Sequence, residues 1–264
     1  MGKGAAAMKA LFVKDMRQLW RSFRLPALLL TGLFFAILDP IGAKYMPQIM
    51  EQLMRGAEGI AIVFPEMGPE DALISYLGKN LTQMGAFVVI LTAMGAVAGE
   101  RERGISAWVL TRPVGRLPYL YSKLAAYSAG LLLMVGSGTL LASLYTASLF
   151  GAPPPGSTTW GALFLFLYLE LILVLTISSS ALLRGQIAAG GLSFAAMMLL
   201  WLPQLFLERT SAGRYMPYRL SSLIADLLKG EAVPLDFLPA LAAALLLAAA
   251  VLTAASLTFQ RAEL

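Results

Sequence analysis

Long apolar runs separated by short polar segments dominate this sequence. A helix needs about 20 mostly apolar residues to cross a bilayer, and six segments of the chain are long and apolar enough to do so. These segments are residues 25–43, 81–99, 124–150, 160–183, 187–207 and 237–259. The first is the weakest, because Asp39 and Pro40 follow its uninterrupted apolar part. The pattern predicts an all-α polytopic membrane protein whose six transmembrane helices form one domain over residues 1–264.

The segment before the first span has an amphipathic pattern. Apolar residues recur there at helical spacing, and basic residues fall largely on the other side. The apolar positions are Met8, Phe12, Met16, Leu19 and Phe23, and the basic ones are Lys9, Lys14, Arg17, Arg21 and Arg24. This pattern predicts an interfacial helix that lies in the headgroup plane of the membrane. The alternative is a basic flank that only fixes the orientation of the first span.

The composition is that of a membrane protein, and it lacks the residues that several kinds of catalytic and metal site need. Of the residues, 58% are hydrophobic and 13% are charged, whereas a soluble domain carries about 25% charged residues. The chain has no cysteine and no histidine, so disulfides, Ser–His pairs and the commonest metal ligand are missing. It also has no Gly-x-x-x-x-Gly-Lys-Ser/Thr phosphate loop. We therefore expect no bound cofactor, no metal and no enzymatic activity in this chain itself.

The positive charge is distributed as an orientation signal. Lysine and arginine number thirteen on the side that holds both termini and the 100–123 loop, against seven on the other side. Cytoplasmic loops carry the excess of basic residues, so both termini and this loop are predicted to lie in the cytoplasm. The net charge of +5 then reflects topology in a cytoplasmic membrane, and we expect no nucleic-acid partner.

Two acidic residues fall within apolar spans. Glu170 lies near the middle of the fourth span, where a charged side chain is costly and usually faces the protein interior or a wet cavity. It is either a substrate or coupling-ion contact, or a structural hydrogen-bonding group paired with a serine or threonine of a neighbouring helix. Asp39 lies near the far end of the first span, and we expect it to reach the outer headgroups as an interfacial cap.

The loop between the second and third spans is the most distinctive polar stretch. It contains the run Glu100-Arg101-Glu102-Arg103-Gly104, then Leu110-Thr111-Arg112-Pro113-Val114, and then Arg116 and Lys123. This pattern resembles the corresponding loop of ABC-2 type transporter permeases. The predicted six spans and the amphipathic N-terminal helix match the same family. Ile105 departs from the family pattern, where many relatives have threonine, so Ser106 is the expected helix cap here.

The resemblance implies a function for the loop. In that family a cytoplasmic coupling helix between spans two and three docks on a separate ABC ATP-binding subunit, which holds ATP and Mg. The residues implied in ATPase coupling are Glu100, Arg101, Glu102, Arg103, Gly104, Trp108, Arg112, Pro113 and Arg116. Trp108 would fill a groove on the partner, and Pro113 would end the helix. The alternative is an ordinary inner loop whose arginines only set topology.

The resemblance also implies the assembly. The chain would be one permease half that pairs with a second half, as a homodimer or a paralogous heterodimer, to move an unidentified substrate, with export the expected direction. Two other functions remain open from the sequence: a non-transporting membrane scaffold or maturation factor, and a membrane-embedded enzyme. Co-purification with an ATPase would separate the transporter from both alternatives.

Overall fold

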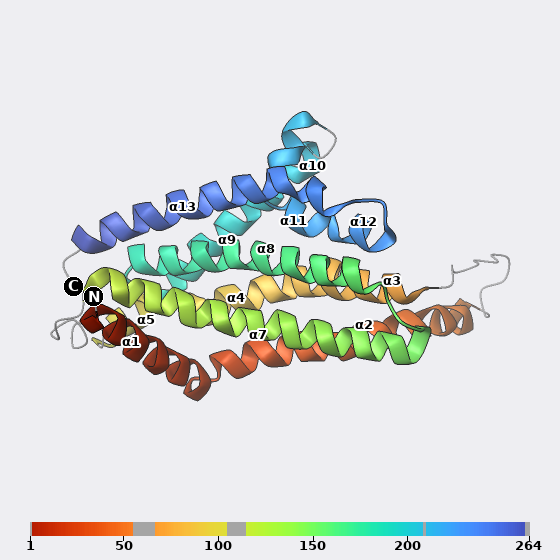
Figure 1. The fold of residues 1–264 in the computed structure, drawn as a ribbon, viewed down its shortest axis with the longest axis horizontal. Helices are drawn as coiled ribbons and strands as arrows, with labels where there is room; N and C mark the ends of the chain where they lie inside the picture. The colour runs from red at the N-terminus through yellow and green to blue at the C-terminus, as the bar shows by residue number, and fades with distance from the viewer. Residues whose placement is uncertain (1, 55–66, 105–114, 208–209, 262–264) are drawn as a thin grey trace.

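The computed structural model describes residues 2–54, 67–104, 115–207 and 210–261, and all the elements in these ranges are helices. Four long helices run roughly side by side along the longest axis of the molecule (Figure 1). They are α2 (Arg24–Met54), α7 (Arg116–Phe150), α8 (Pro155–Leu182) and α13 (Leu238–Arg261). α2 packs on α7, α7 on α8, and α8 on α13. The helix α1 begins and α13 finishes at the same end of the bundle, here called the terminal end (Figure 1).

Five helical segments within the described residues are long and apolar enough to cross a membrane. They are Arg24–Met50, Pro69–Glu102, Arg116–Phe150, Pro155–Leu182 and Pro234–Arg261. These segments correspond to the predicted spans one, two, three, four and six. The all-helical, multi-span architecture expected from the hydropathy pattern is therefore confirmed for this part of the chain.

The predicted fifth span is divided in two. The helix α9 (Gln186–Trp201) has 16 residues, and a short helix α10 (Gln204–Leu207) follows it. Pro203 lies between them, and proline has no amide hydrogen to donate to a helical carbonyl. α9 is apolar but shorter than the five spanning helices, so a sixth crossing stays a prediction.

The second spanning segment begins much earlier than predicted. It consists of α3 (Pro69–Leu73), the π-helix η1 (Ile74–Gly85) and α4 (Ala86–Ala93). Residues 69–80 were expected in an outer loop, because Lys79 and Asn80 lower the local hydropathy. That boundary is wrong, since Tyr76 and Leu77 are fully buried and η1 packs against α2 and α8.

The helix of the second segment breaks after α4 and resumes as α5 (Ala98–Glu102). Ser180 of α8 stabilises this break with three hydrogen bonds. Its Oγ accepts from the amides of Val97 and Ala98 at 3.0 and 2.9 Å, and donates to the carbonyl of Met94 at 2.7 Å. Gly95 lies close to α9 here, because a Cβ on it would be 2.9 Å from Oε1 of Gln186. The broken end of the segment is therefore fixed against α8 and α9.

The amphipathic N-terminal helix is α1 (Gly2–Arg21). It packs on α7 and α2 and meets α2 at a bend where Phe23 has a φ of 60°. The predicted apolar stripe is only partly right, because Phe12, Met16 and Leu19 face the core whereas Met8, Trp20 and Phe23 are exposed. The buried face is instead centred on Leu11, Asp15 and Leu19, which recur every four residues on one side of the helix.

Short helices close the opposite end of the bundle. They are η2 (Ser211–Tyr215), α11 (Arg219–Ser222), α12 (Ile224–Lys229) and η3 (Pro234–Phe237). Residues 211–236 fall between the fifth and sixth predicted spans. Leu220, Ile224 and Leu227 are buried, and α11 and α12 pack on α8. Phe237 stacks on Phe164 with ring centroids 3.8 Å apart, so this end folds onto the bundle.

The stretch 100–123, expected to be a loop, is helical at both edges. α5 extends through Glu102, and α7 begins at Arg116. The third span therefore starts earlier than the predicted residue 124. Residues 105–114 lie outside the described part of the chain, and with them Trp108, Arg112 and Pro113.

Candidate functional site

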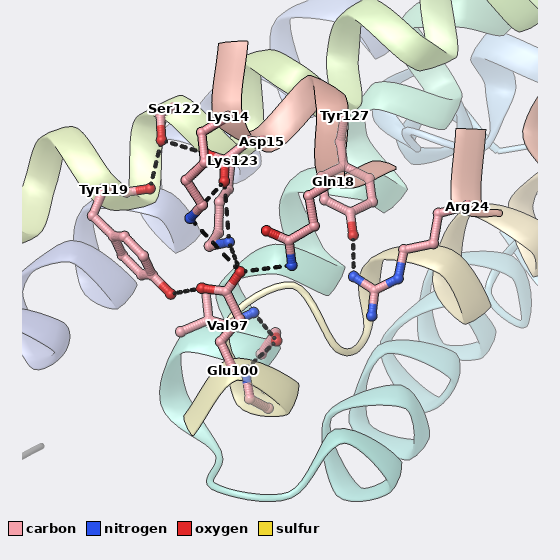
Figure 2. A network of polar contacts seen from close by, with 12 residues as sticks. Lys14, Asp15, Gln18, Arg24, Val97, Glu100, Tyr119, Ser122, Lys123 and Tyr127 are labelled. Atoms are coloured by element: carbon pink, nitrogen blue, oxygen red, sulfur yellow. Dashed lines mark hydrogen bonds and ion pairs between the residues drawn. The ribbon is translucent and has the colours of Figure 1, made fainter. Parts of the chain in front are cut away.

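Glu100 of the family-like motif lies at the centre of a buried polar network at the terminal end of the bundle (Figure 2). Its side chain is 3% exposed, as is that of Lys123. The ammonium of Lys123 donates to Oε1 of Glu100 at 2.7 Å. The hydroxyl of Tyr119 donates to the other carboxylate oxygen. The network thus joins α5, which comes before the undescribed segment 105–114, to α7, which follows it.

The N-terminal helix α1 completes the network. Gln18 donates to Oε1 of Glu100 at 2.9 Å, and Ser122 of α7 donates to Oδ2 of Asp15 at 2.7 Å. Asp15 is also 3% exposed, and its Oδ1 lies 3.5 Å from the ammonium of Lys123. Three segments that are far apart in sequence therefore meet at one point (Figure 2).

The charges in this cluster balance. Lys14 lies 3.2 Å from Asp15 and 4.0 Å from Glu100, so two carboxylates face two ammonium groups. Buried ions are costly unless they are paired and hydrogen-bonded. Removing one partner of such a pair costs about 3–5 kcal/mol, because the other charge is left uncompensated. The network therefore fixes the relative positions of α1, α5 and α7.

Local helix geometry explains why these side chains meet. Tyr119, Ser122 and Lys123 are three and four residues apart, which places them on one face of α7. Asp15 lies between Leu11 and Leu19 on the buried face of α1. Glu100 belongs to the short helix α5, whose first amides are bound by Ser180. Each charged group is thus held by the packing of its own element.

A second polar contact lies beside the network (Figure 2). Arg24, the first residue of α2, donates to the hydroxyl of Tyr127 at 2.6 Å. That hydroxyl donates in turn to the carbonyl of Thr92 at 3.0 Å. The contact links α2 and α7 to the end of α4. It therefore joins the first three spanning segments to one another.

The arginines of the motif contact α13. The guanidinium of Arg101 lies over the ring of Phe259, 5.0 Å from its centroid. Arg116 donates to the carbonyl of Gln260 at 2.7 Å, which satisfies one of the free carbonyls at the end of that helix. The predicted role of these two arginines was to pair with a partner's acids. In the structure they bind the last helix of their own chain.

The remaining described residues of the motif face outward or bind α9. Glu102 accepts a hydrogen bond from the amide of Gln186 at 3.0 Å. Arg103 and Gly104 are exposed, and Gly104 has a φ of 70°, which favours glycine. The motif is therefore divided: Glu100 faces the interior, whereas Arg103 and Gly104 are accessible to a partner.

Glu170 lies apart from this network. The hydroxyl of Ser128 on α7 donates to its Oε1 at 2.5 Å. This contact is the serine hydrogen bond that the structural interpretation of Glu170 predicted. Its Oε2 has no hydrogen-bond partner among the described residues, so the contact does not by itself exclude a ligand.

A cavity of about 480 Å³ opens between the second spanning segment, α8 and α9. Aromatic and methionine side chains form most of its wall, including Phe87, Tyr168, Phe194, Met198, Trp201 and Tyr218. The volume lies in the range of small-molecule sites, which are mostly apolar with few polar groups. Glu170 is not among the lining residues. The cavity thus suits an apolar or amphiphilic molecule better than a cation.

Sequence reasoning found Glu100 and Lys123 but missed their partners. Asp15 was overlooked because it was one acid in a strongly basic helix. The signal that could have identified it is its position between Leu11 and Leu19, four residues from each. An acid on the buried face of a helix requires a partner, and Lys123 is the buried cation that meets it.

Comparison with known proteins agrees with this architecture. Residues 10–219 match the profile of the ABC-2 family transporter proteins. The chain is also 30% identical over 143 residues to a Bacillus subtilis (strain 168) protein named "Uncharacterized transmembrane protein YxlG". That match covers 54% of this chain and 55% of the relative, so it spans about half the length of each. The family match covers most of the chain, and this multi-pass membrane protein therefore belongs to the ABC-2 transporter family.

Proposed function

We propose that this chain is the permease subunit of an ABC exporter and that the Glu100 network transmits movement from the ATPase to the spanning helices. The observation that carries the proposal is the buried cluster of Asp15, Glu100 and Lys123, whose charge is balanced by the neighbouring Lys14. It clamps the two helices that flank the segment 105–114. A force applied to that segment reaches α5 and α7 together, and α1 through Asp15 and Gln18.

The ATP-binding subunit docks on the exposed part of the motif and on the segment that follows it. Arg103 and Gly104 are exposed, whereas Glu100 is enclosed by its own chain. Trp108 and Arg112 supply the anchor and the charged rim, since tryptophan and arginine are the residues most enriched at interface hot spots. ATP and Mg bind to that partner. Two permease halves, identical or paralogous, complete the transporter.

The positions of the termini support six crossings. The bond between Arg116 and Gln260 places the end of α13 beside the start of α7, and α1 begins at this same terminal end (Figure 1). An even number of crossings returns the chain to its starting side, so α9 and α10 together form the fifth span and bring the number of crossings to six. The excess of lysine and arginine makes the terminal end cytoplasmic, with α1 as the interfacial helix.

The aromatic cavity supports an apolar or amphiphilic cargo. Its wall is rich in aromatic and methionine side chains, and methionine adapts to ligands of irregular shape. Glu170 is occupied by Ser128 and contributes no charge to that wall. We therefore assign the cavity to the cargo, which is exported from the cytoplasmic side. Glu170 is assigned a structural role.

The test is to recover the tagged full-length permease from its own host in mild detergent. The proposal predicts that an ABC ATPase co-purifies and that the reconstituted complex hydrolyses ATP faster with amphiphilic cargo present. Trp108→Ala should weaken retention of the ATPase, and Arg103→Glu should weaken it further by placing like charge against acidic groups. Trp160→Ala is the matched control, because Trp160 is half-exposed near the first turn of α8, away from the terminal end.

Two outcomes would contradict the proposal. If both loop variants retain the ATPase and stimulate its turnover normally, the segment is not the docking element. If no ATPase co-purifies with the parent protein under conditions that keep it folded, a scaffold or maturation factor becomes the better assignment.

A further inference from the structure

A second cluster of buried polar side chains lies far from the Glu100 network. It contains Asp39 of α2, Tyr76 and Asn80 of η1, and Thr139 of α7. Thr139 follows Lys123 by 16 residues on the same helix, which places it about 24 Å farther along the bundle. Asp39, Tyr76 and Thr139 are all more than nine-tenths buried. The Glu100 network and this cluster are therefore separate.

The cluster has oxygen atoms without partners. Asn80 donates to Oδ1 of Asp39 at 2.5 Å, but Oδ2 of Asp39 has no hydrogen-bond partner among the described residues. The hydroxyls of Tyr76 and Thr139 face each other and have no hydrogen-bond partner outside this pair among the described residues. The Tyr76 hydroxyl lies next to Thr139 and within electrostatic range of Asp39. Buried polar atoms are almost always satisfied by protein, water or an ion, so these three oxygens point to a missing partner.

The carboxylate also lacks a counter-charge. Within the described ranges, no lysine or arginine lies within ion-pair distance of Asp39. Lys44, about one turn farther along α2, donates to the carbonyl of Leu149 at 2.9 Å, and Lys79 is exposed. An unpaired carboxylate in a membrane-embedded helix bundle is expensive. A cation from solution would remove that cost.

The backbone around the cluster is irregular in two places. Pro40 leaves the carbonyl of Ala36 without its helical donor, and Ala36 shares a face of α2 with Asp39. Tyr76 and Asn80 belong to the π-helix η1, a geometry that is rare and frequently found at functional sites. The hydroxyl of Tyr76 also lies directly against Gly138. A Cβ at position 138 would be 2.1 Å from that hydroxyl, so a larger residue would clash there.

We propose that Asp39, Tyr76 and Thr139 form a binding site for one alkali-metal ion between α2, η1 and α7. Hard cations take oxygen ligands, and membrane transport proteins coordinate such ions with side-chain and freed backbone oxygens at irregular helices. One carboxylate with neutral oxygens matches a single positive charge, whereas Ca²⁺ sites draw on several carboxylates. The site is independent of the ATPase and of the cargo cavity.

The experiment follows thermal unfolding of the purified full-length permease by tryptophan fluorescence at fixed pH and ionic strength. Choline chloride is replaced stepwise by NaCl, KCl or LiCl, with CaCl₂ as the divalent arm. The proposal predicts that at least one alkali-metal ion raises Tm saturably, because a ligand that binds only the folded state stabilises it. The order of the three salts identifies the preferred ion.

The variants locate the site. Asp39→Asn should abolish the shift, and Tyr76→Phe and Thr139→Val, which remove one hydroxyl each, should raise the half-saturating concentration by about tenfold or more. Glu170→Gln alters the other buried acid and should leave the shift intact. Equal Tm of the parent in all salts, a response to Ca²⁺ alone, or a shift that survives Asp39→Asn would each overturn the proposal. A Tm that depends on pH but on no salt would show that Asp39 binds a proton instead.

Discussion

Replacing Lys123 with methionine tests whether the Glu100 network is a rigid joint. The substitution keeps the length of the side chain but removes the ammonium that lies 2.7 Å from Glu100 and 3.5 Å from Asp15. At an effective dielectric constant of about 20, these two contacts correspond to about 6 and 5 kcal/mol of Coulomb attraction. Desolvation of the ions offsets several kcal/mol of that sum.

The expected net loss is about 3–5 kcal/mol, the range for a buried pair that loses one member. For a protein of this size that loss lowers Tm by roughly 10 °C. Lys44→Met is the matched control, because the Lys44 ammonium donates to a backbone carbonyl and faces no carboxylate there. It should cost clearly less than Lys123→Met.

A double-mutant cycle with Glu100→Gln isolates the pair. The double variant should be more stable than the sum of the single effects predicts by about 1 kcal/mol or more, because contacting residues couple by 0.5–3 kcal/mol. In the assembled transporter, Lys123→Met should keep the ATPase bound while reducing stimulated ATP turnover. Additive effects in the cycle, or a Lys123→Met protein with the parent's Tm and turnover, would refute the reasoning.

Three further predictions concern topology, the helix break and Glu170. A cysteine at Ser106 should be shielded from an impermeant reagent outside the cell, while one at the exposed Gly156 should react; the reverse labelling would invert the assigned orientation. Ser180→Ala should lower the free energy of unfolding by about 2 kcal/mol or more, because two amides and a carbonyl lose their partner. Ser179→Ala should cost less, since Ser179 bonds only within its own helix, and equal costs would contradict the capping role. Glu170→Gln should keep cargo-stimulated ATP turnover unchanged, because its amide oxygen still accepts from Ser128; a changed cargo dependence would return Glu170 to the binding site.

Hydropathy located the spans because membrane thickness sets a minimum apolar length, but it placed several ends wrongly. The π-helix region was assigned to a loop since it contains Lys79 and Asn80. In the structure Asn80 is paired with Asp39, and such pairing lets polar residues lie in a spanning helix. The same applies to α7, which begins at Arg116 and includes Lys123, whose charge is paired with buried acids. Pairing between distant residues is not visible in a hydropathy window.

The sequence predicted the candidate site only in part, because contacts between distant residues again decide which charges are buried. The motif from Glu100 to Arg116 contains the residue at the centre of the buried network, but residue type alone does not say whether a charge faces a partner protein or its own chain. Glu100 and Arg103 are two of the four alternating charges of one run, yet one is buried and the other exposed. Helix α5 spans 98–102, so Arg103 lies beyond its last turn while Glu100 faces inward. That distinction depends on where a five-residue helix ends.

The two buried polar clusters obey the same physics with different outcomes. A carboxylate in a low-dielectric bundle needs a positive charge close by. At the Glu100 network the chain supplies that charge from Lys123 and Lys14, so the geometry does not depend on an ion from solution. At Asp39 the described chain supplies an amide and no cation, and in our proposal the charge comes from solution, so its presence varies with ion concentration. The first arrangement suits a joint that must keep its shape while force passes through it. The second suits a part of the bundle whose stability responds to the ions around it.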